Sequence, residues 1–310
     1  MESLVSNLLL VTRQVAVLFA LMAVGFVCNK ARLFGETAVK GMTNLLVVVV
    51  TPCLIVHSFQ RPYDPSMLTG LGVAFAISLA VHVLGMLAGR MLRGGGERSL
   101  PTLRFAVLFS NAGFMGIPLE QAVLGDVGAF YGIVYVVVFN LFMWSWGLRV
   151  MGGRAKPLAM LVNPGTVGVA FGLPLFLLSV RLPAVVHEPI HWMAGLNTPL
   201  AMIAIGYYLI GARLRPALRM RMAWVSAAIR LLACPLVLIA ALYPLRYAID
   251  RTMALALVTA ASAPVAAMVS MFAAKFGRDV DVSVGLVSGT TLASVFTMPV
   301  VLAFAMCVFK

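Results

Sequence analysis

Charged residues, and acidic residues above all, are scarce in this chain. Only 11% of its 310 residues are charged and only 10 are aspartate or glutamate, whereas 62% are hydrophobic. A soluble protein of this size carries roughly a quarter charged residues. Apolar runs near the ~20 residues that cross a bilayer follow one another along the whole length, and none is left over for a soluble domain. The composition excludes a soluble enzyme and predicts an all-α polytopic membrane protein.

Cysteine is also rare, and the usual catalytic motifs are missing. Cys28, Cys53, Cys234 and Cys307 stand alone without CxxC spacing, which excludes a disulfide framework and a thiolate metal site. We expect free, apolar thiols. There is no DDxxD run of a prenyl-transferring membrane enzyme and no GxSxG elbow. The first apolar run lacks the cleavage site of a signal peptide, so we expect it to be retained. No cofactor and no metal are predicted.

The 23 basic residues give a net charge of +13, but their positions argue against nucleic acid as a partner. We predict ten membrane spans, at residues 10–29, 41–59, 67–90, 102–124, 127–149, 161–181, 190–212, 223–245, 251–275 and 282–308. The loops after odd-numbered spans hold Lys30, Arg32, Lys40, Arg90, Arg93, Arg98, Arg104, Arg149, Arg154, Lys156, Arg213, Arg215, Arg219, Arg221, Lys275 and Arg278. The loops after even-numbered spans hold only Arg61, Arg181, Arg246 and Arg251. By the positive-inside rule the first set is cytoplasmic, which predicts both termini outside the plasma (inner) membrane and contact with anionic lipid.

Five spans in each half is an odd number, so the second half is predicted to be inverted relative to the first. We divide the chain into a first repeat (residues 1–150), a cytoplasmic hinge (151–161) and a second repeat (162–310). Thr51-Pro52 of the second span has an echo in Thr198-Pro199 of the seventh. Ser110 aligns with Ser262, and the same offset aligns Gly125 with Gly277. Internal inverted symmetry of this kind is typical of secondary carriers.

Two corresponding spans, the fourth and the ninth, are interrupted by residues that break helices. The interrupting residues are Asn111, Gly113, Gly116 and Pro118 in the fourth span, and Ser262 and Pro264 in the ninth. Backbone groups released from the helical ladder cost several kcal/mol each in hydrocarbon, so matched breaks indicate the substrate site of a transporter. In the inverted arrangement the half-helix after each break points its positive N-terminal end at the midplane, which favours an anion. The Asn111 amide adds a donor. A kink that only eases packing is the alternative for either break alone.

Ionisable groups within the spans are the next candidates. Arg230 lies near the inner end of the eighth span, where snorkelling to the cytoplasm is preferred over substrate binding. We expect His57 and His82 to be structural, hydrogen-bonded histidines. A proton relay is the alternative for His82. Lys275 and Asp279 predict an i,i+4 ion pair, with gating as the alternative. Few carboxylates are available to hold sodium, because Glu120, Asp126, Asp279 and Asp281 all fall at the ends of predicted spans.

His187-Glu188-Pro189-Ile190-His191 fits the HExxH pattern of zinc proteases. That chemistry needs both histidines on one face of a continuous helix and a third ligand. Pro189 sits inside the motif and disfavours a helix at Glu188. We predict that this stretch lies in a short outer loop with no third ligand nearby, and therefore that the match is accidental. A membrane metalloprotease using His187, Glu188 and His191 stays as the alternative from another class.

Three segments resemble one family. SNAGFMGIPL at 110–119, NPGTVGVAFGLPLFLL at 163–178 and SAPVAAMVSMFAAKFGRDVDVSVGLVS at 262–288 are similar to the bacterial auxin efflux carriers, a family that includes malate and malonate permeases and is related to plant PIN-type auxin exporters. The resemblance implies ten helices in two inverted repeats with crossed broken helices, as in bile acid sodium symporters. It also implies that the family's asparagine at the crossover, in the substrate pocket, falls on Asn111. The long hydrophilic loop of PIN-type proteins is absent, since the hinge here has only about a dozen residues.

By the same resemblance, spans one, two, six and seven form a scaffold that often dimerises, and the other spans form a moving bundle. Asn44, Pro52, Asn197 and Pro199 are then expected to face the pocket from the scaffold. We predict a secondary active transporter of small organic anions, dicarboxylates or auxin-like carboxylates, that works by an elevator-like alternating-access mechanism. Proton or sodium coupling and uniport are left open, and a sodium-coupled symporter of the bile acid type is the alternative within transport.

Overall fold

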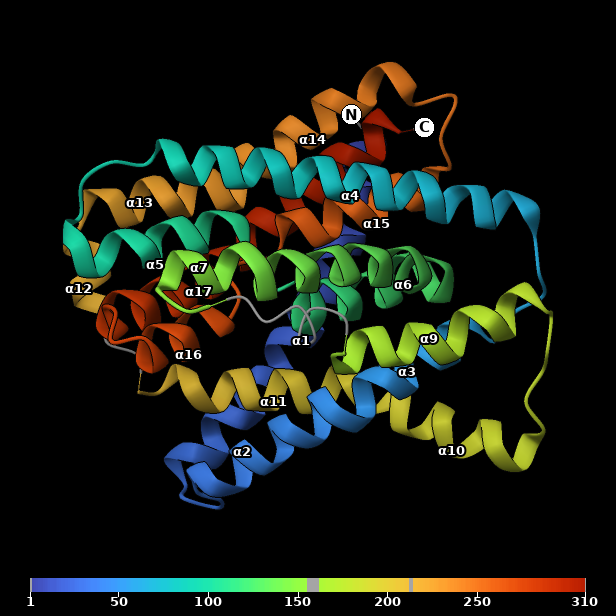
Figure 1. Ribbon diagram of the computed structural model, residues 1–310, viewed down its shortest axis with the longest axis horizontal. Helices are drawn as coiled ribbons and strands as arrows, with labels where there is room; N and C mark the ends of the chain where they lie inside the picture. The colour runs from blue at the N-terminus through green and yellow to red at the C-terminus, as the bar shows by residue number, and fades with distance from the viewer. Residues whose placement is uncertain (1, 155–161, 212–213, 310) are drawn as a thin grey trace.

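The computed structural model describes residues 2–154, 162–211 and 214–309 of the chain (Figure 1). Within these ranges the chain is helical, with one isolated antiparallel bridge between Ser110 and Val265. The predicted hinge at 151–161 lies mostly outside the described residues, as do Lys156 and Arg213.

The first half contains α1 (Glu2–Lys30), α2 (Glu36–Leu45), η1 (Leu46–Val50), α3 (Thr51–Phe59), α4 (Pro65–Met91), α5 (Gly96–Leu108), η2 (Ala112–Gly116), α6 (Ile117–Phe142), η3 (Met143–Gly147) and α7 (Leu148–Met151). The second half contains α9 (Pro164–Leu177), α10 (Ala184–Gly195), α11 (Asn197–Leu209), α12 (Leu214–Arg219), α13 (Arg221–Ala228), η4 (Ile229–Ala233), α14 (Cys234–Leu242), η5 (Tyr243–Leu245), α15 (Arg251–Ser262), α16 (Met268–Lys275) and α17 (Val280–Val308).

Six helical stretches in the described part of the chain are long and apolar enough to cross a membrane: Leu4–Lys30, Glu36–Phe59, Pro65–Met91, Ala112–Met151, Arg221–Leu245 and Val280–Val308. The expected multi-pass membrane protein is therefore confirmed. The number is smaller than the ten predicted spans for a structural reason. Ala112–Met151 counts as one stretch although Gly125, at φ 71°, turns the chain inside α6. The predicted sixth, seventh and ninth spans consist of shorter helices, so the count of ten stays a prediction.

Three of the π-helical turns stand directly before a proline. η1 precedes Pro52, η2 precedes Pro118 and η4 precedes Pro235, each proline being at the start of the helix that follows. A proline has no N–H and its ring collides with the carbonyl four residues earlier. Widening the turn before the proline relieves that collision without ending the helix. These wide turns are therefore the local response to prolines in long apolar helices.

Helices distant in sequence pack in pairs. α1 lies against α11 and α17, α3 lies against α9 and α10, and α6 lies against α15 and α4. A Cβ added to Gly25 of α1 would overlap the backbone of Ile203, and one added to Gly206 of α11 would overlap the backbone of Met22. Small residues thus bring the α1 and α11 backbones into direct contact, as in other membrane helix pairs.

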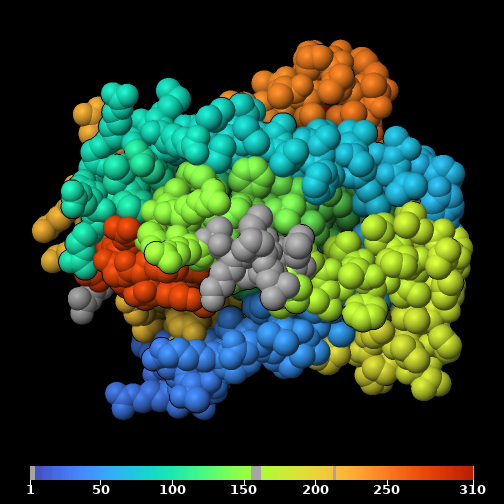
Figure 2. Space-filling model, viewed as in Figure 1, coloured from blue at the N-terminus to red at the C-terminus, as the bar shows by residue number. Residues whose placement is uncertain are grey.

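The turns divide between the two ends of the molecule. The α4–α5 turn, α12 and the α16–α17 turn lie at one end, and the α3–α4, α9–α10 and α14–α15 turns lie at the other (Figure 1). In the space-filling view α16 packs beneath the α4–α5 turn, so segments from both halves share that face (Figure 2). The first group of turns holds Arg90, Arg93, Arg98, Arg215, Arg219, Lys275 and Arg278, whereas the second holds only Arg61, Arg181 and Arg246 among the described residues, an asymmetry of the kind that the positive-inside rule describes.

Candidate functional site

The two breaks predicted in the fourth and ninth spans lie directly against each other. α5 ends at Leu108 and α15 ends at Ser262, and short non-helical segments follow both. The Asn111 N–H donates to the Pro264 carbonyl at 2.6 Å, and the Ala266 N–H donates to the Phe109 carbonyl at 2.9 Å. Each break thereby satisfies backbone groups of the other in the middle of an apolar protein. We call this antiparallel contact, residues 109–111 with 263–266, the crossing.

Arg230 is buried beside the crossing and does not reach the cytoplasm. Its side chain is 1% exposed, and its guanidinium donates to the carbonyls of Val107 at 3.2 Å, Leu108 at 3.0 Å and Ala261. These carbonyls belong to the C-terminal ends of α5 and α15, where partial negative charge collects. The expectation of snorkelling is therefore wrong. Because α5 and α15 end at the breaks, their last carbonyls have no partner within the helix and can accept from Arg230. In an unbroken helix these carbonyls would be bonded to the next turn.

The helix that follows the first break begins with a set of free donors. The Asn111 carbonyl accepts from the N–H groups of Met115 and Gly116, while its side chain makes no capping hydrogen bond and is 6% exposed. A Cβ built on Gly113 would meet no atom within 4 Å, so this turn borders open space. At Gly116 a Cβ would lie 3.4 Å from the Cα of Ala260 and 3.5 Å from Oε1 of Glu120. Pro118 is buried near the start of α6, where the absence of an N–H costs little.

The second break is stabilised by hydrogen bonds within α15 and to α17. The Ser262 hydroxyl donates to the Thr259 carbonyl at 2.9 Å, and the Pro264 carbonyl is part of the crossing. The Val265 N–H donates to the Thr290 hydroxyl of α17 at 3.1 Å. Sequence reasoning missed Thr290. Its only signal was a pair of threonines, at 290 and 291, in a span that also holds Ser283, Ser288, Ser294 and Thr297.

The four residues expected to reach the pocket from the scaffold have different surroundings. Asn197 is 2% exposed, its side-chain nitrogen has no hydrogen-bond partner among the described residues, and its helix α11 packs against η2. Pro199 is half-buried on the same helix. Pro52 packs beneath Gly168 of α9, and Asn44 is exposed on α2. Asn197 is thus the member of this group whose helix lies against the first break, and the role of all four stays a prediction.

Further buried polar groups line the same region. The Tyr135 hydroxyl interacts with the side chains of Ser110 and Arg230, although neither it nor the Ser110 hydroxyl makes a hydrogen bond of good geometry within the described chain. The His82 ring lies 4.8 Å from the Tyr135 ring, with Nδ1 at 2.8 Å from the Ser78 carbonyl and Nε2 unpaired. Buried polar atoms normally have partners, so this concentration beside the crossing suits a polar ligand.

Lys275 and Asp279 do not form the predicted ion pair. α16 ends at Lys275, Gly277 adopts a positive φ of 62°, and Asp279 caps the next helix by accepting from the Val282 N–H at 3.0 Å. The two residues therefore belong to different helices. Asp279 instead accepts from the Ser99 hydroxyl at 2.6 Å, which joins α17 to α5, and Lys275 is exposed. Gly277 lies between the two charged residues, and glycine commonly ends a helix at such a position. The i,i+4 spacing predicts an ion pair only where the helix continues through both residues.

The HExxH segment is helical, which contradicts the predicted loop. Pro189 lies inside α10, and a third histidine, His57 of α3, stands between His187 and His191. Its Nδ1 lies 3.2 Å from Nε2 of His187 and its Nε2 lies 3.3 Å from Nδ1 of His191. Each nitrogen of the His57 ring therefore contacts a different histidine of α10. The three rings form a chain rather than converging on one point, and no metal-binding group is found in the described part of the protein.

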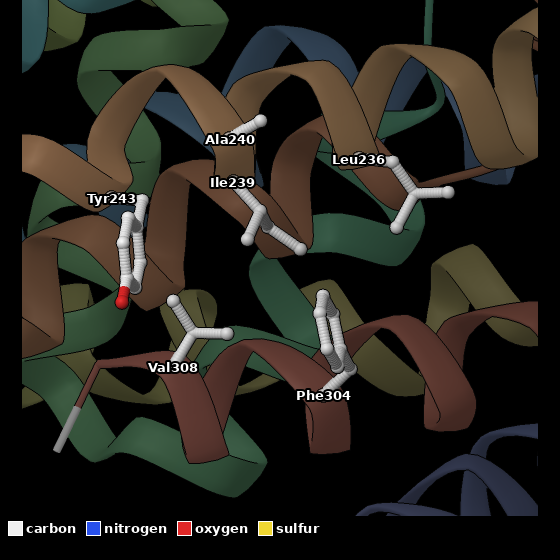
Figure 3. A pocket seen from close by; sticks show the side chains of 6 residues that line it. All are labelled: Leu236, Ile239, Ala240, Tyr243, Phe304 and Val308. Carbon is white, nitrogen blue, oxygen red and sulfur yellow. The ribbon is translucent and has the colours of Figure 1, made fainter.

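A groove of about 320 Å³ on the outside of the molecule is a different kind of feature (Figure 3). It lies between α14 and α17 and is lined by Leu236, Ile239, Ala240, Tyr243, Phe304 and Val308. The lining is almost entirely apolar and contains none of the residues of the crossing. We therefore take the crossing, and not this groove, as the candidate site.

Comparison with known proteins identifies the family of this chain. The sequence model of the membrane transport protein family matches residues 10–161 and 154–302, which together cover most of the chain. No curated protein matches significantly. The chain therefore belongs to the membrane transport protein family, of the auxin efflux carrier type, and is an integral, multi-pass membrane protein of a transporter family.

Proposed function

We propose that this protein is a secondary active transporter of small organic anions that binds its substrate at the crossing. The observation that carries the proposal is the pairing of two broken helices through reciprocal backbone hydrogen bonds, with a buried arginine beside them. Interrupted helices at membrane depth are tolerated where they line a protected cavity, and this is how many carriers build their sites.

The charge balance at the crossing supports an anionic substrate. Arg230 offsets the negative ends of α5 and α15, while the positive ends of the helices that follow the breaks stay available. Asn111 supplies a side-chain amide at one of these ends. A carboxylate there gains charge-assisted hydrogen bonds, which are about twice as strong as neutral ones. Dicarboxylates such as malate or malonate, or an auxin-like carboxylate, follow from the family resemblance.

Alternating access follows from a division into a tightly packed scaffold and a bundle that contains the crossing. The scaffold comprises α1, α2, α3, α9, α10 and α11, among which α1 and α11 touch backbone to backbone. The bundle comprises α4 to α7 and α12 to α17. An elevator-like shift of the bundle carries the site between the two sides of the membrane. Dimerisation through the scaffold, a plasma membrane location and external termini belong to the same proposal.

A sodium-coupled symporter of the bile acid type is less well supported. Such a site would use backbone carbonyls exposed at the breaks. Here the carbonyls of Val107, Leu108 and Ala261 accept from Arg230, and those of Phe109 and Pro264 are used in the crossing. Five carbonyls at the breaks are therefore already engaged, which leaves fewer oxygens there for a sodium ion.

Uptake of labelled malate, malonate and indole acetate into proteoliposomes tests the proposal. We expect saturable uptake of at least one anion by the wild-type protein and its loss in Asn111→Ala. Asn7→Ala is the matched control, because Asn7 lies on α1 near its N-terminal end, away from the crossing, and donates only to Cys307 Sγ at 3.7 Å. Undiminished uptake by Asn111→Ala would move the site elsewhere, and no uptake by the wild type would discard these substrates.

A further inference from the structure

Glu120 is a fully buried acid that the crossing does not use. It lies in the first turn of α6, after the first break, and is 0% exposed. Neither carboxyl oxygen has a hydrogen-bond partner in the described residues. The chain turns at Gly125, shortly after Glu120, and the part of α6 beyond the turn folds back over the carboxyl, so a place near the end of the predicted span does not expose it.

Glycines create the space that the Glu120 carboxyl occupies. A Cβ on Gly132, in the part of α6 beyond the turn, would overlap Oε2 of Glu120. On the other side, a Cβ on Gly116 would make ordinary contacts with Oε1 of Glu120 at 3.5 Å and with the Cα of Ala260 in α15 at 3.4 Å. The carboxyl thus lies in a fitted pocket between the two parts of α6, beside the second broken helix.

No charged group compensates an ionised Glu120 at this position. The described titratable side chains on α6 itself and on the elements packed against it are Arg13, Cys28, Lys30, Cys53, His57, His82, Arg90, Asp126, Tyr131, Tyr135 and Arg251. None of them hydrogen-bonds or forms an ion pair with Glu120. Arg230 directs its Nη donors to backbone carbonyls. A lone carboxylate in such surroundings is far costlier than a neutral acid, so Glu120 is accommodated here as the neutral acid.

We propose that Glu120 carries the proton that couples this transporter to a pH gradient, an inference that rests on the transport function proposed above. The acid is neutral while it is enclosed between the two parts of α6 and α15. When the bundle moves and water reaches the pocket, the carboxyl ionises and releases the proton. A group bound to a proton in one conformation and not in the other shifts the balance between them. A sodium ion is a poorer fit, because it needs several oxygen ligands and this pocket is lined by glycine and alanine.

Accumulation of labelled anion in proteoliposomes, with the membrane potential clamped, tests this coupling. A gradient of about one pH unit drives up to about tenfold accumulation for one coupled proton, and its polarity distinguishes symport from antiport. In the isosteric variant Glu120→Gln we expect exchange and downhill uptake to persist and gradient-driven accumulation to vanish. Glu97→Gln, which makes the same change in an exposed residue of α5, is expected to behave like the wild type.

Two results would overturn the proposal: an undiminished response of Glu120→Gln to the pH gradient, or wild-type accumulation that follows a sodium gradient instead. A second measurement needs no substrate. The infrared spectrum of the wild-type protein at neutral pH is expected to contain a protonated-carboxyl band that is absent in Glu120→Gln. Absence of that difference also contradicts the proposal. If the wild type takes up none of the anions, the transport proposal fails while the spectrum still decides the state of Glu120.

Discussion

Glycines in the α1–α11 contact and glycines at the crossing are used in opposite ways. At Gly25 and Gly206 the facing helix leaves no space for a side chain, since an added Cβ would overlap its backbone. Gly113, the second residue of the helix after the first break, has no neighbour within 4 Å of where its Cβ would be. In the first region the missing side chain allows helices to approach. In the second it leaves room, which is what a substrate site requires.

The largest effect on stability is expected at the α1–α11 contact, where the backbones leave no space for a side chain. Gly206→Ala forces α1 and α11 apart, because the new methyl collides with the backbone of Met22. We expect a loss of about 3 kcal/mol of stability, measured as a fall in the thermal unfolding midpoint in detergent. Gly72→Ala on α4, where a Cβ meets nothing within 4 Å, is the control and is expected to leave the midpoint unchanged or raise it. Equal midpoints for the two variants would refute the close-contact reading of the scaffold.

Replacing Arg230 tests whether the crossing depends on a buried charge. Arg230→Gln removes charge-assisted hydrogen bonds to the ends of α5 and α15 and leaves their carbonyls unpaired, so we expect a loss of about 2 kcal/mol. Anion uptake is expected to fall at least about tenfold, the equivalent of 1.4 kcal/mol. Arg246→Gln is the matched control, since Arg246 is only half-buried and its contacts are local, to the Tyr243 carbonyl at 3.0 Å and to the rings of Tyr243 and Tyr247. Normal uptake by Arg230→Gln would separate the arginine from substrate binding.

Gly113→Ala separates space for a ligand from space for packing. The added methyl has room in the protein and a better helix propensity than glycine, so the unfolding midpoint is expected to stay or to rise. The KM for anion uptake is expected to increase several-fold, because the methyl enters the open region at the end of the helix. Gly132→Ala should show the reverse pattern, with a lowered midpoint, because its methyl would overlap the carboxyl of Glu120. If both variants changed only the KM, or only the unfolding midpoint, the distinction between space for a ligand and space for packing would be contradicted.

The smallest effect is expected at Ser262, although its alignment with Ser110 made it a candidate. Its hydroxyl is already bonded to the Thr259 carbonyl within the same helix. Ser262→Ala should therefore change stability by about 1 kcal/mol or less, with uptake within about twofold of the wild type. A large loss of uptake would show that this hydroxyl turns toward the substrate in another state of the transport cycle.

Some of this site was readable in the residues. Asn111, Gly113, Pro118 and Pro264 interrupt apolar runs, and interruption is a local property that needs no knowledge of neighbours. The alignment of Gly125 with Gly277 also has a local basis, since both adopt a positive φ where a helix turns. Arg230 was misjudged for the opposite reason. Its short distance from a span end predicted snorkelling, but its real surroundings come from helices that are remote in the sequence, as do those of Glu120.

The sequence by itself determined the membrane class, the separation of basic loops, and the places where two helices break, because each depends on composition or on the intrinsic limits of proline and glycine. Only the tertiary structure decided which groups meet. It brought the two breaks into one hydrogen-bonded crossing, turned Arg230 onto the carbonyl ends of α5 and α15, and enclosed Glu120 between glycines. It also joined His57 to the histidines of α10 while ending a helix between Lys275 and Asp279. A contact between distant helices depends on how all of them pack together, and no spacing along one segment contains that information.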